Sequence, residues 1–338
     1  MSSRMTALVK AEPGPGARLT EVDVPTPGYG EILVRVEVAS ICGTDHHIYA
    51  WDRWAAGRIK TPLVFGHEFS GEVVAVGPGP SPVAPGDRVS AESHIACGRC
   101  FQCRTGNMHV CEFAAILGVD VPGCFAEYVV IPAANAWPNP PGLDPELASI
   151  QEPVGNAVHT ALSGELTGRR VAVLGCGPIG LAAVATCAAA GAAAIFAADL
   201  VPYRLELARR LGATRVVDAG QRNAAEVVLE MSGNPRALQG GLRMLRNGGR
   251  IALLGLPAEP VELDLARDVI FKGITLQGIT GRRMYETWFL TSSLLASGRM
   301  DLRGLVTHRF PLSRFEEAME LVGSGECGKV MLYPGPRG

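Results

Sequence analysis

The sequence lacks any long hydrophobic segment. Among its 338 residues, the longest apolar run lies around residues 181–198, is rich in Ala and Gly, and is interrupted by Gly191. A membrane-spanning helix needs about 20 consecutive apolar residues, so we expect no membrane span and no membrane partner. The N-terminal stretch MSSRMTALVK has no apolar region followed by a small-residue cleavage site, so we also expect no signal peptide.

An excess of charge of either sign is lacking too. The formal net charge is −2 and the isoelectric point is about 6.4, which argues against nucleic acid as the main partner. Internal repeats and low-complexity tracts are absent from the sequence, and an apolar fraction of 47% excludes a disordered chain. The length fits two domains of ordinary size.

Cysteine, in contrast, is plentiful. Nine cysteines without an export signal predict a reducing compartment, here the cytoplasm, where thiols bind metals or stay buried. Four of them lie in CGRCFQCRTGNMHVC with C-x2-C-x2-C-x7-C spacing; they are Cys97, Cys100, Cys103 and Cys111. Four thiolates can surround one zinc ion and leave no position for substrate, so the sequence predicts a structural site. An iron–sulfur cluster is the less favoured alternative, because the last spacing and the lack of Pro after Cys111 fit it poorly.

The chain changes character near Gly168. Before it, short alternating runs such as EILVRVEVAS (31–40) and EVVAVG (72–77) are bounded by Pro and Gly, which is typical of β-strands. After it, apolar strands alternate with helical stretches, which predicts a doubly wound parallel sheet. The expected strands are 171–175, 195–199, 215–217, 227–231, 250–255 and 274–278. From about residue 290, a helix–strand–helix–strand pattern is expected to return to the first domain.

The segment VAVLGCGPIG indicates a dinucleotide site. Gly175, Gly177 and Gly180 have G-x-G-x-x-G spacing, directly after an apolar strand and at the start of a helix. The spacing suits a tight turn, close approach of the backbone to a pyrophosphate, and close helix–strand packing. Asp199 ends the next strand and would bind ribose hydroxyls and repel an extra phosphate, which favours NAD. Arg204 leaves NADP open, because a nearby arginine can bind a 2′-phosphate.

A second group of metal-binding residue types lies in ICGTDHH (41–47), FGHEFSGEVVAVG (65–77) and QEPVGNAVHTA (151–161). Taken together, these segments offer one thiolate, one imidazole and carboxylates. That is the ligand set of a catalytic zinc that keeps one position open. The residues concerned are Cys42, Thr44, His47, His67, Glu68 and Glu152.

These motifs carry a resemblance to a known family. GHEFSGEVVAVG, the four-cysteine segment and GCGPIG resemble the zinc-containing medium-chain alcohol dehydrogenases. The segments ICGTDHHIYAWDRW, CFAEYVVIPAANAW, EPVGNAVHTAL and GRRMYETW (281–288) are similar to the L-threonine 3-dehydrogenase branch of that family. The likeness runs from about residue 6 to 332.

The resemblance implies an α/β fold with a GroES-like β-rich catalytic domain and a Rossmann domain built on a doubly wound parallel sheet. We expect the catalytic domain at 1–155, with a structural zinc lobe at 94–113. The NAD-binding domain is expected at 156–289, and a C-terminal return to the catalytic domain at 290–338. It further implies two zinc ions per chain, NAD as cofactor, and a homotetramer.

Site roles also follow from the resemblance. The implied ligands of the catalytic zinc are Cys42, His67 and Glu68, and Glu152 would enter the coordination sphere or orient the metal. Thr44 and His47 match a proton relay. The implied NAD contacts are Ile179, Asp199, Arg204, Leu254, Gly255, Leu256, Ile279 and Thr280, and in this setting Arg204 follows the NAD pattern.

The implied reaction is oxidation of a secondary alcohol, with L-threonine converted to 2-amino-3-oxobutanoate. In the family mechanism zinc lowers the alcohol pKa, the relay removes the proton, and the nicotinamide accepts hydride. Another polyol, butanediol or amino alcohol is the alternative substrate. A protein that binds zinc and NAD without catalysis is a third hypothesis, less favoured because each matched position holds a competent residue.

One connection departs from the family pattern. Only nine residues, 218–226, separate the third and fourth strands of the NAD-binding domain, where relatives usually carry a helix. Nine extended residues reach about 30 Å, and the crossing to the fourth strand needs about 22 Å. We therefore expect an extended connection, a less covered sheet face on the adenine side, and lower stability there.

Overall fold

The change in character near residue 168 matches a change of architecture in the computed structural model, which describes residues 4–218 and 221–335. The chain forms two units: Met1–Pro153 with Val306–Ser324 and Lys329–Gly338, and Val154–Leu305 with Gly325–Gly328. These bounds differ from the predicted ones at the C-terminal side. Residues 290–305 belong to the second unit, so the return to the first unit begins at Val306 and not at 290.

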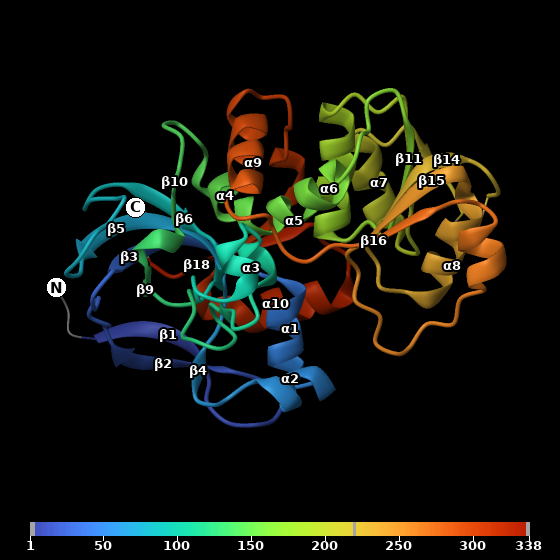
Figure 1. Cartoon of the computed structure of the whole chain (residues 1–338). Helices are drawn as coiled ribbons and strands as arrows, with labels where there is room; N and C mark the ends of the chain where they lie inside the picture. The colour runs from blue at the N-terminus through green and yellow to red at the C-terminus, as the bar shows by residue number, and fades with distance from the viewer. Residues whose placement is uncertain (1–3, 219–220, 336–338) are drawn as a thin grey trace. The chain divides into compact units, whose positions relative to one another are not determined.

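The first unit is dominated by antiparallel strands around β3 (Glu31–Ser40), the segment EILVRVEVAS (Figure 1). In the described chain its larger sheet has the order β10-β6-β5-β3-β18-β17, and β9 also pairs with β3. The other strands are β5 (Glu68–Val76), β6 (Arg88–Ala91), β9 (Tyr128–Pro132), β10 (Ala136–Pro138), β17 (Val306–Pro311) and β18 (Lys329–Tyr333). Because β18 pairs with β3, Met331 and Leu332 lie beside Ser40 and Ala39.

Smaller elements complete this unit. A second sheet has the order β2-β1-β4, with β1 (Arg4–Lys10), β2 (Arg18–Asp23) and β4 (Leu63–Val64), and β7 (His94–Ile95) pairs with β8 (Ala115–Ile116). The helices are α1 (Gly43–Ala50), α2 (Arg53–Arg58), α3 (Phe101–Arg104), α4 (Pro145–Ser149) and α10 (Phe315–Ser324). Helix α5 (Gln151–Leu162) contains the boundary between the two units.

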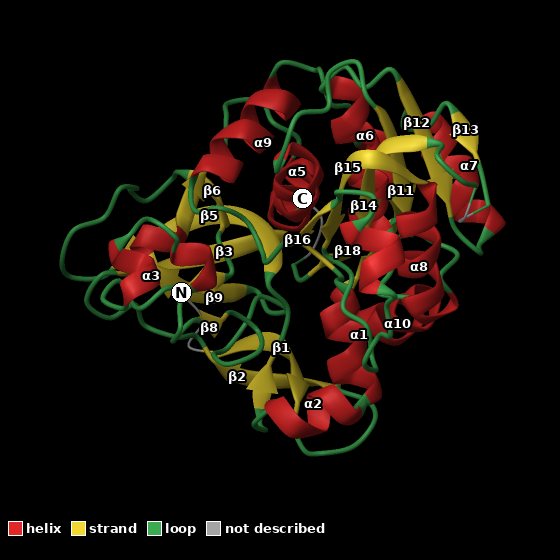
Figure 2. Ribbon diagram, turned by 45° about the vertical axis from the view of Figure 1, so that its right-hand side comes forward, coloured by secondary structure: helices red, strands yellow, loops and turns green. Residues whose placement is uncertain are grey.

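The second unit contains the predicted parallel sheet (Figure 2). Its order among the described residues is β13-β12-β11-β14-β15-β16, the doubly wound order of a dinucleotide-binding domain. The strands are β11 (Arg170–Leu174), β12 (Ala194–Ala198), β13 (Arg215–Val216), β14 (Ala225–Glu230), β15 (Leu245–Leu253) and β16 (Thr275–Gly278). Val171 to Leu174 are all buried, because helices cover both faces of such a sheet.

The helices of this unit are α6 (Pro178–Ala189), α7 (Pro202–Arg210), α8 (Pro235–Met244) and α9 (Glu286–Ala296). Leu238 and Leu242 of α8 pack in one buried cluster with apolar side chains of β11, β14 and β15. Helix α6 contacts β11, β12 and α7. None of the helices in the described part of the chain is long and apolar enough to cross a membrane.

The short connection between β13 and β14 is not fully extended, because residues 222 and 223 form a turn and Asn223 has a φ of +52°. Its described residues, 217–218 and 221–224, contain no helix; residues 219 and 220 of the predicted segment lie outside the described ones. A cavity of about 900 Å³ lies beside it, lined by residues that include Phe196, Val217 and Arg222. Phe196 is only partly buried although it lies within β12. In the described part of the chain, this face of the sheet is therefore only partly covered, as the length of the connection predicted.

Candidate active site and cofactor site

Cys42 lies at the N-cap of α1, with extended backbone angles and a side chain that accepts the amide of the first helical turn. The Asp45 carboxylate in turn accepts a hydrogen bond from the Cys42 amide, at 2.8 Å. This reciprocal capping fixes the direction of the thiol. A cysteine binds metals through its sulfur, so the capping also sets the direction in which a metal could be bound.

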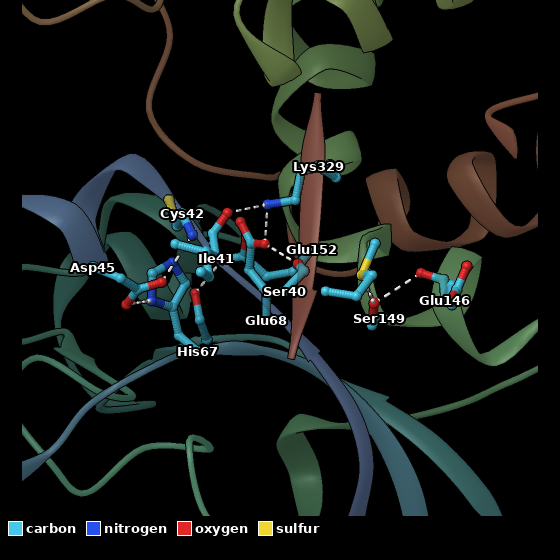
Figure 3. A network of polar contacts seen from close by, with 12 residues as sticks. Ser40, Ile41, Cys42, Asp45, His67, Glu68, Glu146, Ser149, Glu152 and Lys329 are labelled. Carbon is cyan, nitrogen blue, oxygen red and sulfur yellow. Dashed lines mark hydrogen bonds and ion pairs between the residues drawn. The ribbon is translucent and has the colours of Figure 1, made fainter. Parts of the chain in front are cut away.

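His67 and Glu68 come from the segment FGHEF, where the chain turns into β5. Gly66 makes this turn possible, because its φ is +92° and an added Cβ would lie 2.5 Å from the ring of Phe125. The Cys42 sulfur, a His67 ring nitrogen and a Glu68 carboxylate oxygen all lie within 4.8 Å of one another (Figure 3). The structure thus brings together the three residues predicted to bind the catalytic zinc.

Asp45 supports His67. Its carboxylate is fully buried and lies 3.6 Å from His67 Nδ1, an arrangement that leaves the other ring nitrogen for a metal. Burial disfavours a charged imidazole, but Asp45 and Cys42 outweigh this and raise the pKa of His67 well above its usual value. Burial raises the pKa of Asp45 to about 6, partly offset by His67.

Glu68 forms a buried ion pair with Lys329. Its Oε2 accepts hydrogen bonds from Ser40 and from Lys329, the first residue of β18. Lys329 is 2% exposed and also donates to the carbonyl of Ile41 at 2.8 Å. Burial would lower the pKa of Lys329, but the charge of Glu68 outweighs it and raises that pKa. Oε1 of Glu68 is buried and has no hydrogen-bond partner among the described residues, so one carboxylate oxygen is left over.

Glu152 is also buried in this unit, near the N-terminus of α5. One of its carboxylate oxygens accepts a hydrogen bond from the Ser93 hydroxyl at 2.5 Å. Glu152 does not belong to the group of three ligand atoms described above. Glu68 therefore lies with the other candidate zinc ligands in this structure, and Glu152 does not.

The donor set fits zinc. A thiolate, an imidazole nitrogen and a carboxylate oxygen are ligands that a catalytic zinc takes, with a fourth position left for substrate. The unpartnered Oε1 of Glu68 fits the same conclusion, because a buried carboxylate oxygen without a donor is costly unless a cation satisfies it.

The two residues predicted as a proton relay lie on α1. Thr44 and His47 are three positions apart, so their side chains share one face of the helix. Nδ1 of His47 lies 2.6 Å from Oδ2 of Asp52, which the sequence did not single out. Trp54 of α2 packs edge-on against the His47 ring, with centroids 6.3 Å apart.

The four cysteines of the 97–111 segment converge as predicted. The measured Sγ–Sγ distances are 4.0 Å for Cys97 and Cys103, 3.5 Å for Cys100 and Cys103, and 3.8 Å for Cys100 and Cys111. Zn–S bonds of about 2.3 Å in a tetrahedron place sulfur atoms about 3.8 Å apart. An iron–sulfur cluster would need room for several atoms between the thiolates, so these distances favour a single zinc. Backbone amides of Arg99 and Cys100 lower the pKa of Cys97 to about 6, which favours the thiolate.

The glycine loop of the second unit has the geometry that its sequence predicted. Gly175 has φ +90°, and a Cβ on Gly180 would lie 1.9 Å from the carbonyl oxygen of Gly175. A Cβ on Gly177 would meet no atom within 4 Å, so this glycine is not required by contacts within the unit. The second glycine of this motif is needed instead for close approach of a pyrophosphate.

Asp199 lies at the end of β12, beside this loop. Its carboxylate accepts hydrogen bonds from the amides of Cys176, at 2.6 Å, and Val201, at 2.8 Å. Arg204 Nη1 is 3.9 Å from Asp199, and the same guanidinium donates to the carbonyl of Gly325. Arg204 is thus already engaged, which fits a site for NAD better than one for NADP. Ile179 lies in the first turn of α6, next to the loop.

The other predicted cofactor residues line a separate cavity of about 250 Å³ at the carboxyl ends of β14, β15 and β16. Those in its wall are Leu254, Gly255, Leu256, Ile279 and Thr280. Glu230, which the sequence analysis did not select, also lines it and accepts hydrogen bonds from the amides of Ser232 and Gly233. Burial raises the pKa of Glu230.

Sequence reasoning missed the residues that support the metal ligands and the relay. Asp45 lies within the ICGTDHH segment and could have been found by its capping position three residues after Cys42. No local signal marks Lys329, because its partner Glu68 is 261 residues away in the chain. Asp52 could have been found as an N-cap before α2, but its contact with His47 depends on the turn between the helices.

Comparison with known proteins gives matches to alcohol dehydrogenases in both units of the chain. Residues 28–141 match the alcohol dehydrogenase GroES-like domain, and residues 178–297 match the zinc-binding dehydrogenase domain. An L-threonine 3-dehydrogenase of Symbiobacterium thermophilum is 54% identical over 347 residues, covering 99% of each chain.

Solved structures show the same similarity. A short chain alcohol dehydrogenase (rspB) from E. coli, complexed with NADH, is 30% identical with a TM-score of 0.90, covering 98% of this chain and 100% of the other. The 2R,3R-butanediol dehydrogenase of Bacillus subtilis is 28% identical with a TM-score of 0.88 over the same shares. The two matched domains and the similarity over nearly the full length show that the chain belongs to the zinc-containing medium-chain alcohol dehydrogenase family.

Proposed function

We propose that the protein is a zinc- and NAD-dependent dehydrogenase that oxidises the secondary hydroxyl of L-threonine to give 2-amino-3-oxobutanoate. The observation that carries this proposal is the 54% identity with an L-threonine 3-dehydrogenase over 99% of both chains. The convergence of Cys42, His67 and Glu68 adds independent support, because it preserves a complete ligand set. A non-catalytic relative would have no need of such a set.

Cys42, His67 and Glu68 would hold the catalytic zinc, and the four cysteines of the 97–111 segment would hold a structural one. When bound, zinc supplies a Lewis acid that lowers the pKa of the alcohol, and NAD supplies a hydride acceptor. Glu152 is buried in the same unit and adds negative charge that affects the pKa of His67. We assign it the role of tuning the charge around the ligands.

Thr44 and His47 would carry the proton from the substrate hydroxyl to solvent. The Thr44 hydroxyl can accept one proton while donating its own to His47 Nε2. His47 is suited to the last transfer because its side chain is 58% exposed to water. An imidazole also titrates near neutral pH, where both of its protonation states are accessible.

In the second unit, Asp199 would bind the adenosine ribose, and the amides at the start of α6 would face the pyrophosphate. Backbone groups of residues 254–256 and 279–280 would bind the nicotinamide half. Together with Gly175, Gly177, Ile179, Gly180 and Arg204, these form the proposed NAD site.

A second candidate is oxidation of a different secondary alcohol by the same machinery. The likeness to 2R,3R-butanediol dehydrogenase, with a TM-score of 0.88, favours this alternative, because one scaffold serves several alcohols. The zinc ligands and the relay would be unchanged. The two candidates differ only in which alcohol is bound.

We also propose a homotetramer located in the cytoplasm. Support for assembly comes from exposed apolar side chains in and before β16, the last strand of the parallel sheet in the described chain: Leu265, Ile270, Phe271 and Leu276. Light scattering coupled to gel filtration tests the assembly, with a mass of four chains of 35.6 kDa as the expected result.

The function is tested by following NADH formation at 340 nm with L-threonine, 2,3-butanediol and sorbitol, each before and after removal of metal by a chelator. Turnover of L-threonine that is lost on chelation and restored by zinc supports the first candidate. Turnover of the other alcohols alone would replace it with the second. A protein that binds NAD and zinc but turns over none of the three would contradict both.

A further inference from the structure

Asp52 occupies the junction between α1 and α2, directly after Trp51, whose φ of +57° turns the chain out of α1. Its two carboxylate oxygens have different partners. Oδ1 accepts the amide of Ala55 at 2.9 Å and so caps α2. Oδ2 lies 2.6 Å from Nδ1 of His47. One side chain therefore ties the start of α2 to the histidine near the end of α1.

The cap makes this contact rigid. A capping carboxylate is fixed in position by the helix amide it accepts, so Oδ2 is presented to His47 in one direction. The helix that follows also places Trp54 edge-on against the His47 ring. The imidazole is thus oriented by two residues of one short helix segment.

The contact also selects a tautomer. Because the carboxylate is an acceptor only, His47 must donate from Nδ1, and the lone pair of the neutral ring is then on Nε2. Thr44 lies on the same face of α1, three positions earlier. A hydroxyl proton can therefore be accepted at Nε2 without a change of tautomer.

The charges around His47 are consistent with this arrangement. The hydrogen bond from Ala55 lowers the pKa of Asp52, with His47 adding to the effect, so this carboxylate stays ionised at neutral pH. Burial lowers the pKa of the neighbouring His46, so that imidazole is neutral. In the described chain, Asp52 is thus the charged group in direct contact with His47.

We propose that Asp52 is a positioning residue for the proton relay: it holds His47 with the proton on Nδ1 and stabilises the imidazolium that forms when Nε2 accepts the Thr44 proton. The substrate hydroxyl proton passes to Thr44 Oγ1, the Thr44 proton passes to His47 Nε2, and the imidazolium releases a proton to water. The inference rests on the proposed function, since it requires that the relay operates.

The test compares two variants that keep the helix cap. In Asp52→Asn the amide oxygen can still cap α2, but the NH2 group would face His47 Nδ1 and donate to it, which places the ring proton on Nε2. In Asp52→Ser the cap is kept and the partner of His47 is removed. Asp144→Asn is the matched control, because Asp144 caps α4 of the same unit through the amide of Glu146.

We expect Asp52→Asn to lower kcat/KM about 10- to 100-fold, a part of the 10²–10⁴-fold that a general base contributes. Asp52→Ser should lower kcat/KM less than Asp52→Asn does, because the His47 imidazole in this variant can still adopt either tautomer. In both variants the acidic limb of the pH profile should move to lower pH, because each variant removes the negative charge that contacts the relay imidazole, and a nearby negative charge favours the protonated ring. Melting temperatures and zinc content should match those of the wild type and of Asp144→Asn.

Two results would overturn the inference. One is an unchanged pH midpoint and rate in Asp52→Asn while His47→Gln is strongly impaired, which would leave the relay intact and Asp52 a helix cap only. The other is an equal rate loss in Asp52→Asn and Asp144→Asn accompanied by a lower melting temperature. If His47→Gln itself keeps full activity, the relay in the proposed function has failed, and a wild-type protein inactive on every alcohol shows that the function has failed.

Discussion

Replacement of Lys329 by methionine tests whether the buried ion pair behind the metal site holds the first unit together. Methionine keeps the length and the apolar part of the side chain but removes the charge. Glu68 would then be left fully buried with its charge unpaired, apart from the hydroxyl of Ser40. Removing one partner of a buried pair costs about 3–5 kcal/mol in the free energy of unfolding.

Lys10→Met is the matched control. Lys10 is also in the first unit and is 1% exposed, but its ammonium donates to the carbonyls of Gly14 and Gly16 and has no carboxylate partner in the contacts described. Its loss leaves neutral carbonyls unsatisfied, at a cost of about 1–3 kcal/mol. The double variant Lys329→Met with Glu68→Gln should recover much of the loss, because neither member of the buried pair is then charged.

The assay is urea unfolding of the chelator-treated protein, followed by tryptophan fluorescence. The signal reports mainly on the first unit, which contains Trp51, Trp54 and Trp137, whereas Trp288 lies in the second. The expected order of stability is wild type, Lys10→Met, the double variant close to it, and Lys329→Met last. If Lys329→Met is no less stable than Lys10→Met, or the double variant shows no recovery, the ion pair does not have the role assigned to it.

Two further predictions concern the cofactor and the structural metal. Gly177→Ala should fold with an unchanged melting temperature, since the added Cβ would meet no protein atom within 4 Å. The same variant should raise the Kd for NAD, measured by titration calorimetry, at least tenfold. An unchanged Kd would place the pyrophosphate elsewhere. Cys103→Ala should lower the zinc content from two ions per chain to one and increase cleavage by trypsin after Arg99 and Arg104, because loss of the metal loosens the segment that carries these exposed side chains. Cys187→Ala, which removes a buried thiol of α6, should retain both ions; two ions in Cys103→Ala would contradict the structural site.

Much of the second unit could be predicted from the sequence, because its signals are local. Continuous apolar runs mark strands buried on both faces, and the glycine spacing between β11 and α6 marks the turn where a phosphate can approach. Even the less covered face beside Phe196 followed from chain length, since nine residues cannot both cross the sheet and form a full helix.

The boundary at which the chain returns to the first unit was harder to predict from the sequence. Residues 290–305 have the same helix and turn patterns whether they pack in one unit or the other, so the predicted return at 290 came too early. Packing decides such a boundary, and packing depends on contacts between residues distant in sequence. The strand that completes the first unit was found as an element, but its place beside β3 was not.

The candidate metal-binding side chains could be predicted from the sequence. The four cysteines of the 97–111 segment follow from their spacing, and Cys42, His67 and Glu68 follow from the resemblance to the family; the structure brings the members of each group together. The groups that orient and balance them were decided by the tertiary structure. Lys329 reaches Glu68 only because β18 pairs with β3, and Asp52 reaches His47 only because Trp51 turns the chain between two helices. A ligand is a property of a side chain, whereas a buried charge or a fixed tautomer is a property of what the folded chain places against it.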